Sequence, residues 1–74
     1  MWWLVFDVNG ERCVWLEDAP DMVQARFKAT MAGSKGSFLE GHELDRKTAK
    51  KVPNDLVGRI LRNPEAMRLL KKLG

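Results

Sequence analysis

Acid/base or metal chemistry has one place to reside in this sequence, the stretch that carries Glu40, His42, Glu43 and Asp45. Carboxylates and imidazole transfer protons and bind metal ions when they converge on one point. In an extended segment alternate side chains face opposite ways, so Glu40 and His42 share one side and Glu43 takes the other. The set does not converge. We therefore expect a solvated strand, with no catalytic residue, no metal and no cofactor.

The other reactive groups are few, because the chain has one cysteine, one histidine and no tyrosine. A single thiol forms no intrachain disulfide, and one cysteine with one histidine does not complete a zinc shell. Cys13 lies in an apolar run, where a thiol acts as a small hydrophobic side chain and fits a reducing compartment. The sequence thus predicts a non-enzymatic protein of the cytoplasm, without a small-molecule substrate.

A Gly-x-x-Gly spacing from Gly33 to Gly36 is a weak signal for a loop that contacts phosphate. A phosphate-binding loop would need a Gly-Lys-Ser/Thr ending and a following helix, and both are missing. The segment is interpreted as a flexible connector.

The elements that position the remaining side chains begin with the stretch from Trp2 to Glu17. Asn9-Gly10 separates two runs of β-branched and aromatic residues there, which predicts a hairpin with a two-residue type I′ turn. The turn sets Asp7 opposite Arg12, and we expect an ion pair between them. One face then carries Trp2, Leu4, Phe6, Val8, Cys13 and Trp15, and the other carries Trp3, Val5, Val14 and Leu16.

Both faces of this hairpin are apolar, whereas a half-exposed antiparallel sheet normally has one polar face. A chain of 74 residues buries only about 60% of the surface that it exposes when unfolded, so its margin of stability is thin. Cover on both faces must therefore come from the chain's own helices, from a second copy in a homodimer, or from a partner.

A helix is predicted from Ala19 to Ala32, with Asp18 as its cap and Gly33 as its terminator. This helix is expected to cover one face of the sheet. The residues expected to face the sheet are Val23, Phe27 and Met31.

A third strand is expected from Ser37 to Leu44, with a bulge at Gly41. The fold class is α+β, a β-β-α-β unit followed by two or three short helices. The helical starts are Asp45 as a cap before Arg46–Val52, then Leu56–Arg62, and then a helix that begins at Asn63-Pro64. These helices, or a second subunit, are expected to cover the other face.

Charge divides this single domain, which carries a net charge of +3. Residues 1–45 form an acidic core and residues 46–74 a basic helical extension. The basic half can contact nucleic acid or an acidic protein, or can attract the acidic half of its own chain. Its basic residues are Arg46, Lys47, Lys50, Lys51, Arg59, Arg62, Arg68, Lys71 and Lys72.

The function that these observations favour is a small interaction module that binds a protein partner. Tryptophan is enriched at interface hot spots, so Trp2, Trp3 and Trp15 are the candidate contact residues, with core filling as the alternative. By analogy of size, the module is an inhibitor of a host complex, of the kind that phages and other mobile elements encode. Nucleic-acid binding by the basic helices is the alternative function, but no aromatic residue lies among the cations for base stacking. Asp7 interrupts the apolar N-terminal run after six residues, so neither a signal peptide nor a membrane span is expected.

Overall fold

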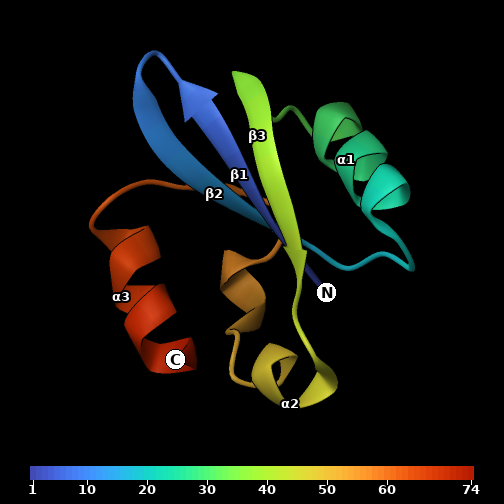
Figure 1. The fold of residues 1–74 in the computed structure, drawn as a ribbon, viewed down its shortest axis with the longest axis vertical. Helices are drawn as coiled ribbons and strands as arrows, with labels where there is room; N and C mark the ends of the chain where they lie inside the picture. The colour runs from blue at the N-terminus through green and yellow to red at the C-terminus, as the bar shows by residue number, and fades with distance from the viewer.

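The computed structural model describes residues 1–74, which form an antiparallel four-stranded sheet with helices on both faces (Figure 1). The chain is of the α+β class, as expected. The strands are β1 (Trp2–Val8), β2 (Glu11–Glu17), β3 (Ser37–Glu43) and β4 (Ile60–Leu61), and the helices are α1 (Met22–Met31), α2 (Arg46–Ala49), the 3-10 turn η1 (Asn54–Leu56) and α3 (Glu65–Leu73).

The β1–β2 hairpin has the register that the sequence predicts, with Phe6 opposite Cys13 and Asp7 opposite Arg12. Asn9 and Gly10 both have positive φ, 55° and 85°, as a type I′ turn requires. The expected ion pair between Asp7 and Arg12 does not form. Asp7 Oδ1 instead accepts a hydrogen bond of 2.7 Å from the backbone N–H of Gly10, so its carboxylate closes the turn.

The third strand pairs with β1, which gives the sheet order β3-β1-β2-β4. The predicted bulge lies at Leu39 and not at Gly41, because Val5 pairs with Glu40 while Phe6 pairs with Phe38. Gly41 is required for a different reason, the close approach of α1. A Cβ at this position would lie 2.8 Å from Sδ of Met22, so the missing side chain lets α1 cross close to β3.

The predicted helix over Leu56–Arg62 is wrong. Its place is taken by η1 and by the two-residue strand β4, which pairs with Val14 and Trp15 of β2. Leu61 is fully buried there. The i, i+3, i+4 spacing of the apolar residues suited a helix, but the open edge of β2 offers backbone hydrogen bonds that no local pattern reveals.

The first helix is shorter than expected and begins at Met22, because Asp21 and not Asp18 is its cap. Asp21 Oδ1 accepts from the backbone N–H of Gln24 at 2.8 Å. At the other end Gly33 terminates the helix as predicted, with Ser34 N–H donating to the Ala29 carbonyl. This hydrogen bond belongs to a Schellman motif.

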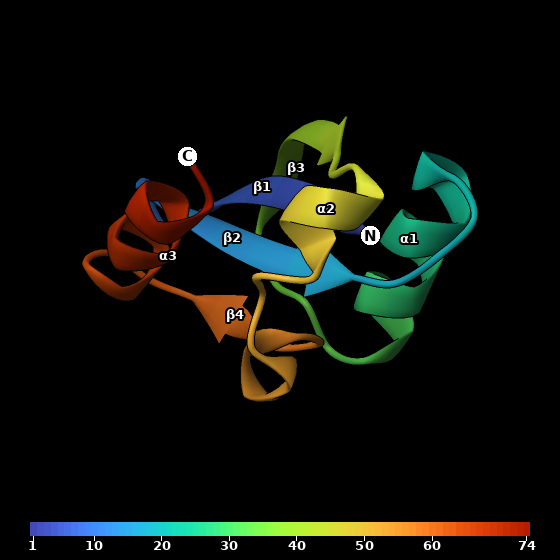
Figure 2. The same cartoon turned by 90° about the horizontal axis from the view of Figure 1, so that it is seen from below.

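Two cores lie on the two faces of the sheet, as Figure 2 shows by placing the sheet between α1 and α3. The sorting of the hairpin residues to the two faces is confirmed, and so is the cover of the second face by the C-terminal half. The α1 core contains Leu4, Phe6, Trp15, Ala25 and Ala29, and the α3 core contains Trp3, Val5, Val14, Leu16, Val52, Leu61, Ala66 and Leu69.

The C-terminal elements are held by short-range caps and by one bidentate contact. Asp45 caps α2, as predicted, by accepting from Thr48 N–H at 2.7 Å, although α2 ends at Ala49 and not at Val52. The guanidinium of Arg59 donates to both carboxylate oxygens of Glu65, at 3.3 and 2.6 Å. It thereby joins the segment before β4 to the first turn of α3.

Candidate protein-contact surface

The outer face of α1 carries three large apolar side chains, while a fourth, Met22, packs against the sheet. Val23, Phe27 and Met31 are 74%, 65% and 73% exposed, and their i, i+4, i+8 spacing aligns them in one row. We call this row the α1 stripe. The prediction that these three side chains face the sheet is wrong, since they point the opposite way.

Two alanines occupy the position at the sheet that was predicted for the larger residues. Ala25 and Ala29 are both fully buried against Leu4, Phe6 and Trp15. The sheet face is already filled by aromatic and branched side chains, so only a helix surface of small residues can approach it. The signal was present in the sequence, because Ala25 and Ala29 form their own i, i+4 row.

The α1 stripe is large for a surface feature of a 74-residue chain. Three such side chains at these exposures present on the order of 400 Å² of apolar surface, within the range of functional patches on monomeric proteins. Because this area stays in water, the chain forgoes the free energy that its burial would contribute, although a domain of this size is only marginally stable. A hollow of about 300 Å³ lies beside the stripe and is lined by Val23, Arg26, Phe27 and Thr30.

Positive charge borders the α1 stripe on both sides. Arg26 and Lys28 are the sequence neighbours of Phe27, so they stand about 100° to either side of it. Neither forms an ion pair: Lys28 Nζ donates to the neutral backbone carbonyl of Asp18 at 2.7 Å, and the Arg26 guanidinium lies 4.1 Å from the ring centre of Phe38. The helix itself contains no acidic residue.

The three tryptophans predicted to be contact residues are not together on the surface. Trp3 and Trp15 are only 9% and 4% exposed and belong to opposite cores, so this part of the prediction is corrected in favour of core filling. Trp15 Nε1 donates to Glu17 at 3.0 Å. Trp2 is half-buried, and its Nε1 is the one enclosed side-chain donor without an acceptor.

A second apolar hollow, of about 300 Å³, lies between α3 and the end of β3. Trp3, which is buried, and Leu70, which is 48% exposed, are among the residues that line it. The other lining residues are His42, Leu44, Thr48, Leu73 and Gly74.

The predicted basic surface divides into structural and free cations. Arg59 is held by Glu65, whose carboxylate accepts hydrogen bonds from the guanidinium and raises its pKa further above the ordinary value. Arg62 pairs with Glu11 at 3.2 Å, which is the one ion pair between the acidic and basic halves. The remaining cations have no carboxylate within ion-pair distance and lie on or beside the two short helices at one end of the molecule (Figure 1). They are Arg46, Lys47, Lys50 and Lys51 at α2, and Arg68, Lys71 and Lys72 on α3.

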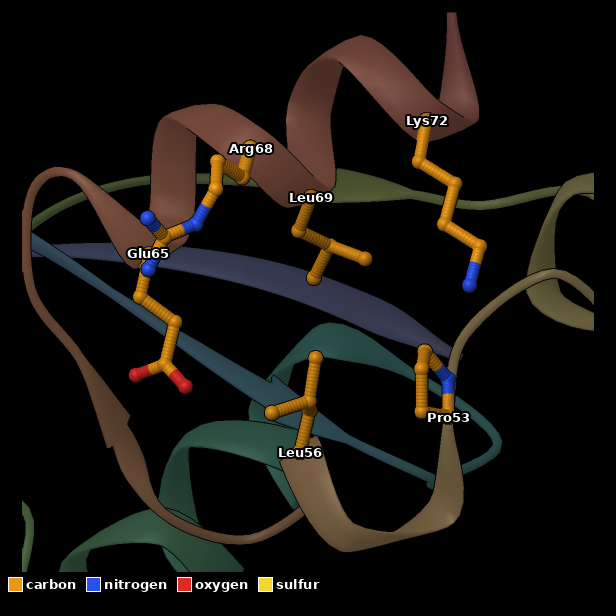
Figure 3. Close-up of a pocket in the computed structure, with 6 residues that line it drawn as sticks. All are labelled: Pro53, Leu56, Glu65, Arg68, Leu69 and Lys72. Atoms are coloured by element: carbon orange, nitrogen blue, oxygen red, sulfur yellow. The ribbon is translucent and has the colours of Figure 1, made fainter.

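Two of these cations border a pocket of about 240 Å³ between η1 and α3. Figure 3 shows Leu69 and Leu56 pointing toward one another across this pocket, with Lys72 extending along its Pro53 side. The pocket thus combines an apolar floor with a cationic rim. Its one carboxylate, Glu65, is already held by Arg59.

The groups that could do chemistry are dispersed. Glu40 and His42 share a side of β3, 3.4 Å apart and exposed, and no group of three or more His, Cys, Asp or Glu side chains is placed to hold a metal ion. Cys13 is fully buried. Burial, with a smaller contribution from Glu11, raises the pKa of its thiol above 9.0, which keeps the sulfur protonated at neutral pH.

No helix has the length and apolar character needed to cross a bilayer. Comparison of the chain with protein-family models, with curated proteins and with solved structures finds no match.

Proposed function

We propose that this chain is a small, non-enzymatic module that binds a protein partner through the outer face of α1. The observation that carries the proposal is the exposure of Val23, Phe27 and Met31 on a helix that turns its alanines inward. Proteins of this size need their large apolar residues for the core. Their placement in one exposed row is what a contact surface requires and what stability alone disfavours.

Standard interfaces bury about 800 Å² on each partner and concentrate their binding energy in a few central side chains. The α1 stripe would supply the centre of such an interface, with Phe27 in the middle of the row. The polar and charged side chains beside it would form the rim. Occupying the surface of a larger complex, as an inhibitor does, requires no catalytic group.

The proposal is tested by photo-crosslinking in the native host. A photoreactive amino acid replaces Thr30, which lines the hollow beside the stripe. We expect a discrete protein adduct that disappears when Phe27→Gln is added. The control is Met67→Gln, which replaces another exposed apolar side chain, on α3, and the adduct should persist with it. An adduct that survives Phe27→Gln, or no adduct, would contradict the proposal.

Nucleic-acid binding is the second candidate function, and the seven unpaired cations at α2 and α3 favour it. If they contact phosphates, affinity for labelled duplex or single strands should persist at physiological salt and fall steeply as salt rises. We expect only weak attraction that vanishes near physiological salt, because solvated helix faces and helix ends place lysines and arginines there in any case.

A further inference from the structure

We propose that the partner of the α1 stripe is an acidic amphipathic helix, with apolar side chains along one face and carboxylates on both borders of that face. This inference rests on the proposed function, since it names the class of partner for the same surface. It is carried by the combination of a helical ridge, a neighbouring hollow and two unpaired cations.

The shape of the surface suits a helix. Val23, Phe27 and Met31 form a single i, i+4, i+8 ridge, which is about 12 Å long at the helical rise of 1.5 Å per residue. Such a ridge packs into the groove between two rows of side chains on another helix. The hollow bordered by Phe27 and Arg26 would receive one apolar side chain of that helix.

The positive charge of the surface favours a partner that carries negative charge. Arg26 and Lys28 stand on opposite borders of the ridge, and both lack a carboxylate partner. The two aspartates just before the helix have other contacts: Asp21 accepts two hydrogen bonds from Gln24, and Asp18 lies 4.0 Å from the amino group of Met1. A partner with carboxylates beside its apolar row would therefore be attracted, and a basic one repelled.

A second copy of this chain fits the surface poorly. Packing two α1 helices face to face brings the cationic borders of one ridge onto the cationic borders of the other. Whether the helices lie parallel or antiparallel, the border with Arg26 or Lys28 on one copy faces a border with one of these cations on the other, and like charges in contact oppose association.

A membrane surface is also the weaker match. Helices that lie in the lipid interface have a broad apolar face and many cations, whereas α1 has ten residues, a single exposed apolar row and two cations.

The test is a selection from a displayed library of random peptides of about 14 residues, the length of four helical turns. The folded chain is the target, and the Phe27→Gln variant is used for counter-selection. We expect the enriched peptides to carry apolar residues at i, i+3 or i+4, and i+7, with acidic residues beside them. Enriched peptides that are neutral or basic would overturn the inference and leave the proposed function standing.

Synthetic versions of the enriched peptides then test the charge directly. Lys28→Glu should weaken their binding several-fold and up to about tenfold, the scale of one or two exposed ion pairs, whereas Lys71→Glu on α3 should leave it unchanged. Equal effects of the two substitutions would contradict the inference. Enriched peptides that bind the Phe27→Gln variant equally well would overturn the inference together with the contact surface itself. The absence of any enriched peptide would do the same.

Two further measurements address the other occupants. Sedimentation of the wild-type chain should show a monomer at all concentrations; a dimer that Phe27→Gln dissolves would replace the acidic helix with a second copy. Flotation with vesicles that contain anionic phospholipid should leave the chain unbound. Binding to vesicles that depends on Phe27 would assign the stripe to a membrane surface and overturn the inference.

Discussion

Ala25 is fully buried, while Phe27, two residues further along the same helix, is 65% exposed. The two positions lie about 200° apart around the helix axis, so one contacts the sheet and the other faces water. The usual assignment of large side chains to the core and small ones to the surface is reversed between these two positions. The helix therefore packs closely on the sheet through its alanines and exposes a ridge of large apolar side chains to solvent.

Enlarging the buried alanine should therefore be costly. We expect Ala25→Leu to lower the free energy of unfolding by about 1–3 kcal/mol, because the added methyl groups force α1 away from Leu4 and Trp15. Gln24→Leu adds an apolar side chain to an exposed position of the same helix and should cost far less. Urea unfolding measures both, and equal stability of the two variants would show that α1 does not pack closely through its alanines.

Two glycines with positive φ should differ in their tolerance of alanine. At Gly10 a Cβ would meet nothing within 4 Å, so Gly10→Ala carries only the backbone cost of the left-handed conformation, about 1–2 kcal/mol. At Gly36 a Cβ would also collide with the backbone carbonyl of Asp7. We expect Gly36→Ala to destabilise the chain more than Gly10→Ala in the same unfolding assay. The reverse order would show that Gly36 does not lie against the backbone of Asp7.

Substitutions of Trp15 and Trp2 should differ in their effect on stability, because only Trp15 has a hydrogen-bond acceptor for its indole N–H. Trp15→Phe removes a bond to Glu17 and leaves a void in the α1 core, with an expected loss of about 1–3 kcal/mol. Trp2→Phe removes an enclosed N–H that has no acceptor, and this relief offsets part of the lost packing. Thermal unfolding of the two variants should therefore give a clearly lower Tm for Trp15→Phe. A lower Tm for Trp2→Phe would mean that its indole N–H has a partner in solution.

The Asp45 cap predicts a local dependence on acid. Hydrogen bonds from the backbone N–H and the side chain of Thr48 lower the pKa of Asp45 below 3.8. A lowered folded-state pKa means that the contribution of the cap is complete above the ordinary value and is lost as pH falls from there through the folded value. NMR signals of Arg46–Ala49 should report loss of α2 in that window. Asp45→Asn keeps a capping side chain that does not titrate. The NMR signals of α2 in this variant should therefore stay unchanged over the same range of pH.

The sequence alone determined the hairpin and two helix ends, the start of α2 at Asp45 and the end of α1 at Gly33, because these depend on neighbouring residues. The Asn9-Gly10 turn sets the register of β1 and β2, and the period of two then sorts every strand residue to its face. Asp45 and Gly33 act on helix ends only a few residues away. The need for cover on both faces followed from the same pattern.

The tertiary structure decided the candidate site and the fourth strand. The spacing of Val23, Phe27 and Met31 indicated an amphipathic helix but not its orientation, since a second row at Ala25 and Ala29 competes for the sheet. The outcome depends on how much room Leu4, Phe6 and Trp15 leave, which is a property of the packed sheet. Ile60–Leu61 became a strand because β2 has an open edge beside it. A local pattern records which side chains can be buried; the space and hydrogen-bonding groups available in the folded chain decide which of them are.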